Sequence, residues 1–143
     1  MQTFTSTVEH TPSLPLPPHL RSHYIDANGM AWQKTDFAGI EMKVLYSDPT
    51  SGMSTILFKM EPGSTVPLHE HTAVEQTYML EGALVDDEGS CGVGSFVWRP
   101  GGNTHVAHAP EGALFISFFT KPNRFFGGEK FFTASEASKL APT

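Results

Sequence analysis

Short apolar segments alternate with glycine- and proline-containing turns along most of this chain. The clearest is Met53 to Met60, and similar segments occupy residues 42–46, 95–99 and 114–119. Segments of this length with turn residues at both ends, and with no long helical period, are typical of β-strands. The pattern therefore predicts an all-β fold, either a sandwich or a barrel.

The two ends of the chain break this pattern. Residues 1–23 are rich in Ser, Thr and Pro and are expected to form an extended arm, followed by a single domain with a C-terminal tail over residues 24–143. Leu14, Leu16 and Leu20 alternate with prolines in this arm. They either lie along a neighbouring surface, since such segments lose little entropy on docking, or belong to a frayed terminus.

One short helix is expected near the C-terminus. Thr133 and Glu136 have the spacing of a capping box, and the helix would run towards Lys139. Four phenylalanines precede it and would be costly to leave in water, so they are expected to cover the barrel or a dimer partner. They are Phe125, Phe126, Phe131 and Phe132.

Composition narrows the class of protein. A chain of 143 residues with 39% hydrophobic and 11% aromatic residues suits one folded domain. The formal charge of −6 argues against a nucleic-acid partner, which would require clustered Lys and Arg. Cys91 is the only cysteine, and no stretch has the form of a secretion signal or a membrane span. We therefore expect a cytoplasmic protein with no membrane association.

Candidate metal ligands begin at His69 and His71. Side chains two apart on a strand point to the same face, so these imidazoles are expected to lie together. Residues 72–74 can form a short bend, after which Glu75 begins an alternating segment. If that segment returns antiparallel to the first, Glu75 lies beside the histidines.

A third histidine follows a second turn. Pro100, Gly101 and Gly102 favour a tight turn that leads to His105 at the start of another strand. Four ligand-type groups would then meet at one divalent ion. Histidines with one carboxylate suit Fe(II), Zn(II), Ni(II), Mn(II) or Cu(II), and affinity order alone does not choose among them. His108 is three residues beyond His105 and should point to the opposite face, so it is not expected to be a ligand.

These two segments resemble the paired signature of the cupin superfamily, over roughly residues 36–122. The resemblance implies a cupin (RmlC-like) double-stranded β-helix, a jelly-roll barrel, with one metal ion held by His69, His71, Glu75 and His105. One position departs from the family pattern, because Ala109 stands where an Asn is usual. That change leaves the implied metal ligands intact.

The flanking phrases are most similar to the ChrR-like group, which includes the cupin half of the anti-sigma factor ChrR. They are residues 37–45, 60–63, 75–82 and 99–105. This group also resembles dioxygenases that cleave acetylacetone or 2,4'-dihydroxyacetophenone. The resemblance implies an Fe(II)-dependent dioxygenase acting on a small diketone or hydroxyketone. In some such enzymes three histidines alone hold the iron, so Glu75 is either a ligand or a catalytic group that influences the proton of the substrate enolate.

Two other functions stay open at this point. One is a metal- or ligand-sensing regulatory cupin without catalysis, similar to the cupin half of the anti-sigma factor. The other is a non-redox metal-dependent isomerase, since this barrel supports many chemistries. The resemblance to cupins of this size also implies a homodimer, and the Pro-rich arm and the phenylalanine pairs would supply apolar surface to bury between subunits.

The sequence gives weaker indications for the residues that surround the metal ligands. The outer ring nitrogens of the histidines are expected to bind Glu70, Gln76 or a backbone carbonyl. Four large side chains are expected either to line a substrate pocket or to pack in an ordinary core. They are Tyr78, Met79, Trp98 and Phe115.

Overall fold

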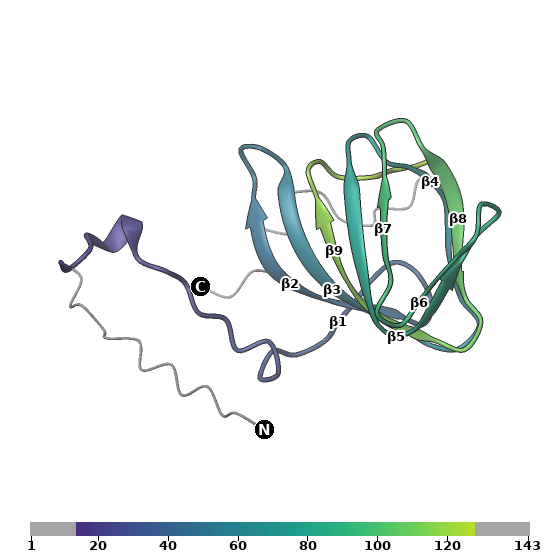
Figure 1. Cartoon of the computed structure of the whole chain (residues 1–143), viewed down its shortest axis with the longest axis horizontal. Coiled ribbons are helices and arrows are strands. Elements are labelled where there is room, and N and C mark those ends of the chain that lie inside the picture. The colour runs from purple at the N-terminus through teal and green to yellow at the C-terminus, as the bar shows by residue number, and fades with distance from the viewer. Residues whose placement is uncertain (1–13, 128–143) are drawn as a thin grey trace, which may run out of the picture.

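The computed structural model of the protein describes residues 14–127 (Figure 1). Ten strands and one short 3-10 helix make up this part of the chain. In chain order they are η1 (Pro18–Leu20), β1 (Gln33–Lys34), β2 (Ile40–Asp48), β3 (Met53–Met60), β4 (Ser64–Glu70), β5 (Glu75–Val85), β6 (Ser90–Gly92), β7 (Phe96–Arg99), β8 (Thr104–Ala109), β9 (Ala113–Phe119) and β10 (Arg124–Phe125).

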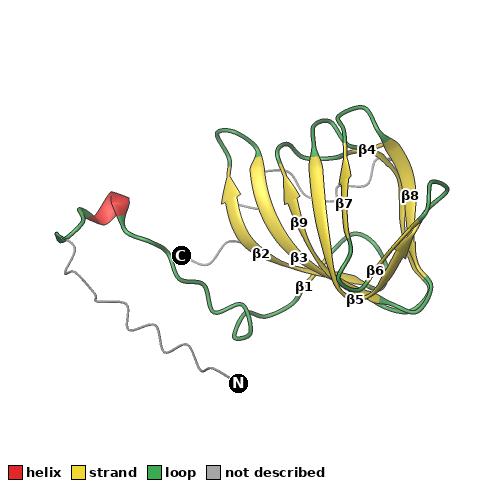
Figure 2. Ribbon diagram, in the orientation of Figure 1, coloured by secondary structure: helices red, strands yellow, loops and turns green. Residues whose placement is uncertain are grey.

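The strands form one antiparallel sheet that curls around its longest member, β5. The order is β1-β2-β3-β9-β5-β8-β4-β10, and β6 and β7 also pair with β5. The first part of β5 lies between β7 and β9, whereas its last residue, Val85, pairs with His108 on β8. The result is the rolled, nearly all-β barrel visible in Figures 1 and 2.

Alternating side chains fill the interior of this barrel. Along β3 every second residue is buried, as period-2 patterning requires. The Phe58 ring lies 5.3 Å from the Phe115 ring and 6.2 Å from the Phe119 ring, measured between centroids. The buried apolar residues are Phe37, Ile40, Met42, Val44, Ile56, Phe58, Met60, Val66, Met79, Leu84, Cys91, Ala107, Ala109, Ala113, Phe115 and Phe119.

Two glycines allow β5 and β9 to pair closely. Gly82 and Gly112 have φ values of 68° and 84°, in the left-handed region that favours glycine. A Cβ on Gly82 would lie 2.0 Å from the carbonyl oxygen of Gly112. Only glycine therefore fits at position 82 without moving the neighbouring backbone.

The chain before β2 has two parts, of which the first is exposed to solvent and the second packs against the sheet. Leu14, Leu16 and Leu20 are exposed, so their docking on another surface stays a prediction. Trp32, by contrast, has the ammonium groups of Lys43 and Lys59 over its ring, at 4.6 and 4.4 Å from the centroid. The outer face of the barrel is therefore covered at its β2–β3 edge.

Most of the predicted architecture is confirmed. The fold is an all-β jelly-roll barrel, and β3 has the predicted limits Met53–Met60. The expected antiparallel pairing of β4 with the segment after Glu75 is wrong, because β4 pairs with β8 and β10. The expected C-terminal helix, with Phe131 and Phe132, lies outside the described residues.

None of the helices in residues 14–127 is long and apolar enough to cross a membrane.

Candidate metal centre

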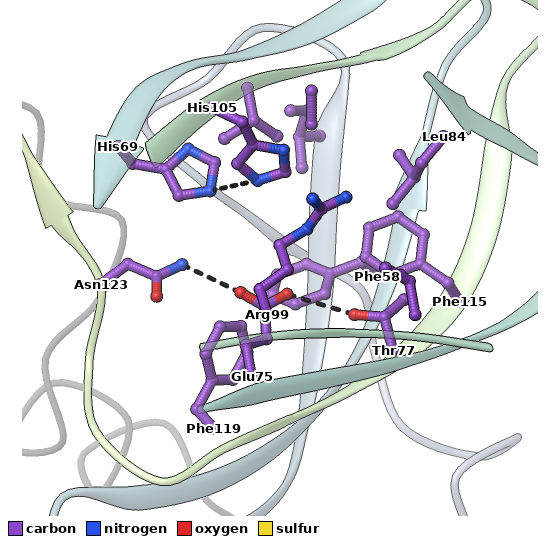
Figure 3. Close-up of a pocket in the computed structure, with 14 residues that line it drawn as sticks. Phe58, His69, Glu75, Thr77, Leu84, Arg99, His105, Phe115, Phe119 and Asn123 are labelled. Carbon is purple, nitrogen blue, oxygen red and sulfur yellow. Dashed lines mark hydrogen bonds between the residues drawn. The ribbon is translucent and has the colours of Figure 1, made fainter. Parts of the chain in front are cut away.

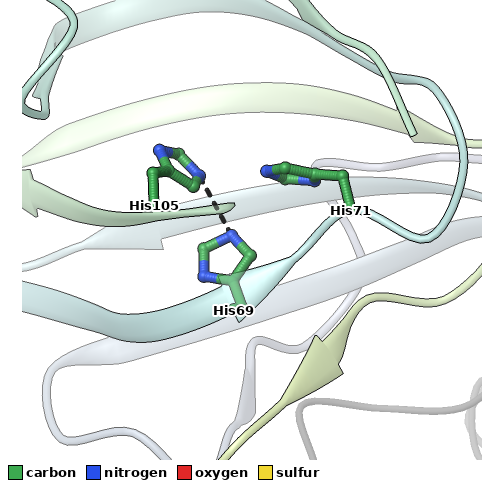
Figure 4. A group of neighbouring side chains, drawn as sticks. All are labelled: His69, His71 and His105. Carbon is green, nitrogen blue, oxygen red and sulfur yellow. Dashed lines mark hydrogen bonds between the residues drawn. The ribbon is translucent and has the colours of Figure 1, made fainter. Parts of the chain in front are cut away.

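Three histidines from two neighbouring strands meet inside the barrel (Figure 4). His69 belongs to β4 and His71 follows that strand directly, while His105 lies on β8. His69 and His105 are register partners across the β4–β8 pair. The 69–71 spacing places the second imidazole on the same side, and the ring centroids of His69 and His71 lie 4.8 Å apart.

The geometry of these rings fits one metal ion. One ring nitrogen from each histidine lies within 4.8 Å of the others, and the Nε2 atoms of His69 and His105 are 3.0 Å apart. Two nitrogens that bind one ion at about 2.1 Å, with an angle of about 90° between them, are separated by about 3 Å. The buried Nε2 of His71 has no hydrogen-bond partner among residues 14–127, as expected of an atom whose partner is a metal ion.

The outer ring nitrogens of two histidines are held by neighbouring oxygens. His69 Nδ1 lies 2.8 Å from the carbonyl oxygen of Pro67, and His105 Nδ1 lies 2.8 Å from Asp86 Oδ2. Each contact favours a proton on Nδ1 and leaves the Nε2 lone pair free to bind metal. The expected backbone carbonyl is confirmed for His69, whereas Asp86 was not foreseen.

Glu75 holds the third ring from outside the histidine group. Its Oε2 lies 2.5 Å from His71 Nδ1, and its Oε1 accepts a hydrogen bond from the Thr77 hydroxyl at 3.1 Å. The side-chain oxygen of Asn123 also lies 3.1 Å from His71 Nδ1. The carboxylate therefore contacts the outer nitrogen of His71, and direct ligation by Glu75 stays a prediction.

Burial and charge keep the site ready for a cation. Burial is the main cause that lowers the pKa of His69 to about 4, and burial and the charge of Arg99 lower the pKa of His105. Burial raises the pKa of Glu75, but its contact with His71 and the nearby imidazoles outweigh this and leave the pKa lowered. At neutral pH, the neutral rings of His69 and His105 therefore lie near an ionised Glu75 carboxylate.

A buried ion pair supports His105 from the other side. Asp86 Oδ2 lies 2.8 Å from Arg99 Nη2 as well as 2.8 Å from the ring of His105. Burial alone would raise the pKa of Asp86, yet the His105 hydrogen bond and the Arg99 charge lower it. Glu88 Oε2 accepts further hydrogen bonds from Arg99 Nη1 and from the Asn103 amide, both at 3.3 Å.

A small apolar cavity adjoins the histidines (Figure 3). Its volume is about 40 Å³, enough for about three water molecules. Figure 3 shows the Arg99 side chain reaching between the imidazoles and the phenylalanine rings. The lining residues are Ile40, Phe58, Val66, His69, Glu75, Thr77, Leu84, Val97, Arg99, His105, Ala107, Phe115, Phe119 and Asn123.

The expected pocket residues divide between the two faces of the sheet. Phe115 lines the cavity, and Met79 is fully buried in the core without lining it. Tyr78 and Trp98 instead lie on the outer face, with exposed fractions of 42% and 60%. His108 is also exposed, where its ring contacts the Thr65 hydroxyl at 2.9 Å, so its exclusion from the ligands agrees with its position.

The sequence interpretation missed Asp86, Arg99 and Asn123. Alternation on β7 provided a signal for Arg99, because residues two apart share a face and Val97 is also inward. A bulge on β5 removed the corresponding signal for Asp86. Asn123 comes from the segment before β10, more than 50 positions beyond His71, and no local pattern marks it.

The sequence profile of the ChrR cupin-like domain matches residues 20–124. The chain belongs to this family. No match was found among curated protein sequences.

Several solved structures share the fold of this ChrR-like cupin. An acetylacetone dioxygenase from Acinetobacter johnsonii is 19% identical, with a TM-score of 0.71, and the match covers 90% of this chain and 97% of that one. A protein from Methylibium petroleiphilum, provisionally assigned the same activity, is 18% identical with a TM-score of 0.73, covering 89% and 100% of the two chains.

The anti-sigma factor ChrR from Rhodobacter sphaeroides, solved in complex with SigE, is a further structural neighbour. It is 20% identical with a TM-score of 0.58, and the match covers 65% of this chain and 51% of that one. At these identities the structural likeness shows the cupin fold alone.

Proposed function

We propose that this ChrR-like cupin is a metal-dependent dioxygenase that cleaves a small diketone or hydroxyketone, with Fe(II) as the favoured metal. The main support is the cluster of His69, His71 and His105, which offer one ring nitrogen each within 4.8 Å of one another beside a small cavity. The structural similarity to the acetylacetone dioxygenase from Acinetobacter johnsonii supports the reaction class. A bound divalent ion would supply a Lewis acid for enolate formation and an electron source for oxygen chemistry.

The residues around the ion have separable tasks in this proposal. The three imidazoles would hold the metal, and Glu75 fixes the tautomer of His71 by accepting a hydrogen bond from its Nδ1–H group. Asp86 does the same for His105. The Glu75 carboxylate also lines the cavity, which supports a role in influencing the proton of a substrate enolate.

The walls of the cavity suit an uncharged substrate that has a small polar group at one end. Leu84, Phe115 and Phe119 line it without polar atoms and would keep water from a reactive intermediate. A volume of about 40 Å³ favours a short-chain substrate or one that moves Arg99 aside as it enters. The proposal therefore favours a small diketone such as acetylacetone over a bulky aromatic ketone.

Oxygen uptake tests this proposal. The Fe(II)-loaded protein is mixed with acetylacetone, 2,4'-dihydroxyacetophenone and related ketones, and dissolved oxygen is followed with an electrode. We expect ketone-dependent uptake that is lost in His105→Ala. A protein shown to hold iron that consumes no oxygen with any ketone in the panel would contradict the dioxygenase assignment.

The family membership and the likeness to ChrR support a second function, a regulatory cupin that senses a metal or ligand. In that case the ion would change the affinity for a regulatory protein rather than take part in catalysis. Affinity capture with and without metal distinguishes the two, because only the sensor recovers a regulatory partner in a metal-dependent way. Zinc kept at full occupancy without oxygen chemistry would favour the sensor or a non-redox isomerase.

A further inference from the structure

The residues that follow β9 run back along the segment that carries two of the histidines. At one end of this contact, β10 pairs antiparallel with β4, and Phe125 lies opposite His69 in the register. At the other end, the Thr120 hydroxyl donates a hydrogen bond to the carbonyl oxygen of Val74 at 2.8 Å. We call residues 120–125 the strap, because they follow the histidine-bearing segment and are attached to it at both ends.

Two side chains of the strap contact the histidine rings. The Phe125 ring stacks on the imidazole of His69, with 5.1 Å between the centroids and 30° between the planes. The side-chain oxygen of Asn123 lies 3.1 Å from His71 Nδ1. Its amide group donates a longer hydrogen bond, of 3.5 Å, to the Glu75 carboxylate (Figure 3). The strap therefore touches two of the three candidate metal ligands.

The strap is weakly attached compared with the strands around it. β10 is two residues long and stands at the end of the strand order, beside β4. Such an edge opens at a far lower free energy than the central strands of a sheet. His69 and His71 are only 4% and 0% exposed, so an ion needs an opening in the wall to reach or leave them. His105 is held by Asp86, which is not part of the strap.

An exposed ion pair closes the strap at its outer side. The Arg124 guanidinium donates to the Glu70 carboxylate, and the exposed fractions of the two side chains are 61% and 25%. The Thr72 hydroxyl adds a hydrogen bond of 2.7 Å to the carbonyl oxygen of Pro122. Exposed ion pairs contribute little to stability, so this contact can break and form again without unfolding the barrel.

We propose that Asn123 and Phe125 are positioning residues for the metal ligands, and that opening of the strap sets the rate of metal release. The proposal depends on the metal site of the proposed function, but not on the reaction carried out there. In the closed strap, these two side chains restrict the rings of His69 and His71 to orientations in which their nitrogens converge. In the open strap both rings lose that restraint, and His105 alone stays in place. One ordered imidazole holds an ion far less firmly than three.

Release of Co(II) into excess EDTA tests the stacking contact. The cobalt-loaded protein is kept under nitrogen, and the visible absorption of bound cobalt is followed with time. Phe125→Leu keeps an apolar side chain but loses the stacked ring, so release should be about 3- to 10-fold faster. Phe125→Tyr restores an aromatic ring and should release cobalt within about twofold of the wild-type rate. Phe118→Leu makes the same change on the outer face of the barrel and should match the wild type.

A second pair of variants tests the exposed ion pair. Arg124→Gln removes the contact with Glu70, so release should be about 2- to 5-fold faster. Lys59→Gln is the matched control, because Lys59 forms an exposed ion pair with Glu41 on the β2–β3 pair. Each substitution makes a chain of charge −6 more negative, which by itself favours retention of a cation. The difference between the two variants should shrink as the salt concentration rises from about 50 to about 500 mM.

The spectrum of bound Co(II) distinguishes positioning from a general loss of stability. Phe125→Leu should shift the visible bands, because the His69 ring is free to turn, whereas Arg124→Gln should leave the bands of the closed state unchanged. If Phe125→Leu does not fold, the comparison at Arg124 decides, since that side chain is exposed.

Two results would overturn the proposal in different ways. Folded Phe125→Leu and Arg124→Gln variants that release cobalt at the wild-type rate would contradict the role of the strap and leave the metal site standing. A wild-type protein that binds no cobalt, iron or zinc would contradict the metal site, and the strap with it.

Discussion

At the scale of single residues, the candidate site depends on what holds each imidazole as much as on the imidazoles themselves. The three rings have three different supports, namely a backbone carbonyl, Asp86 and Glu75. Each support fixes a tautomer that leaves Nε2 free for a metal ion. Substitutions of Glu75 and Asp86 therefore test whether these carboxylates position the imidazoles or bind the metal ion directly.

Glu75→Ala is expected to weaken metal binding without abolishing it. Loss of the contact with His71 Nδ1 should lower the affinity about 10- to 100-fold, the usual effect of removing a group that orients a ligand. Competition with a chelator of known affinity, followed by metal analysis, measures the change. If Glu75→Ala retained no metal at all while His71 and His105 were intact, Glu75 would have to be a direct ligand.

Asp86→Asn tests the support of His105 in the same way. The substitution removes the acceptor charge at the imidazole, so metal affinity should fall about 10- to 100-fold. Glu88→Gln is the matched control, because Glu88 also binds Arg99 but does not contact His105. Equal losses in the two variants would show that the effect arises from Arg99 rather than from the histidine.

At the scale of the strands, alternation explains which site residues the sequence could reveal. Glu75, Thr77 and Met79 point inward with period 2, so the same alternation places Tyr78 outside. Tyr78 therefore lies on the face of the sheet opposite to the pocket in which it was expected. The histidine pair was predictable because His69 and His71 are two residues apart on one strand. The barrel was predictable because short apolar segments alternate regularly with turns.

A bulge explains why Asp86 was not predictable. The register of β5 against β9 shifts between Met79 and Glu81, so the inward positions change from odd to even residue numbers. Leu84 and Asp86 face the interior as a result. A bulge depends on long-range pairing between strands, and the sequence around position 80 carries no clear mark of it.

Glycine substitutions test the antiparallel β5–β9 pairing that helps to place Asp86. Gly82→Ala should destabilise the fold by several kcal/mol, because its Cβ would lie 2.0 Å from the Gly112 carbonyl oxygen. Gly94→Ala is the control: its φ of 76° is similar, but a Cβ there meets no atom within 4 Å, so only the backbone cost of about 1 kcal/mol applies. Urea denaturation of both variants measures the difference, and equal losses would exclude a role for the close approach.

At the scale of the whole molecule, the buried histidines should make the stability of the metal-free protein depend on pH. The folded-state pKa of His69 is about 4, against an ordinary value of 6.5, so the unfolded state takes up a proton first as the pH falls. The free energy of unfolding should therefore decrease from pH 6.5 towards pH 4, by up to about 3 kcal/mol from His69. His105 acts in the same direction.

Denaturation of the metal-free protein at pH 7 and pH 4.5 measures this dependence. A His69→Gln variant supplies the control, since it lacks the titrating ring and should lose less stability over the same interval. A wild-type protein as stable at pH 4.5 as at pH 7 would show that the imidazole is not buried in a neutral form.

Metal stoichiometry after loading and desalting tests the central claim, that His69, His71 and His105 share one divalent ion. The account predicts one ion per chain in the wild type and none retained by His71→Ala or His105→Ala, with circular dichroism confirming that both variants are folded. A wild-type protein that retains no ion, or histidine variants that retain a full equivalent, would contradict it.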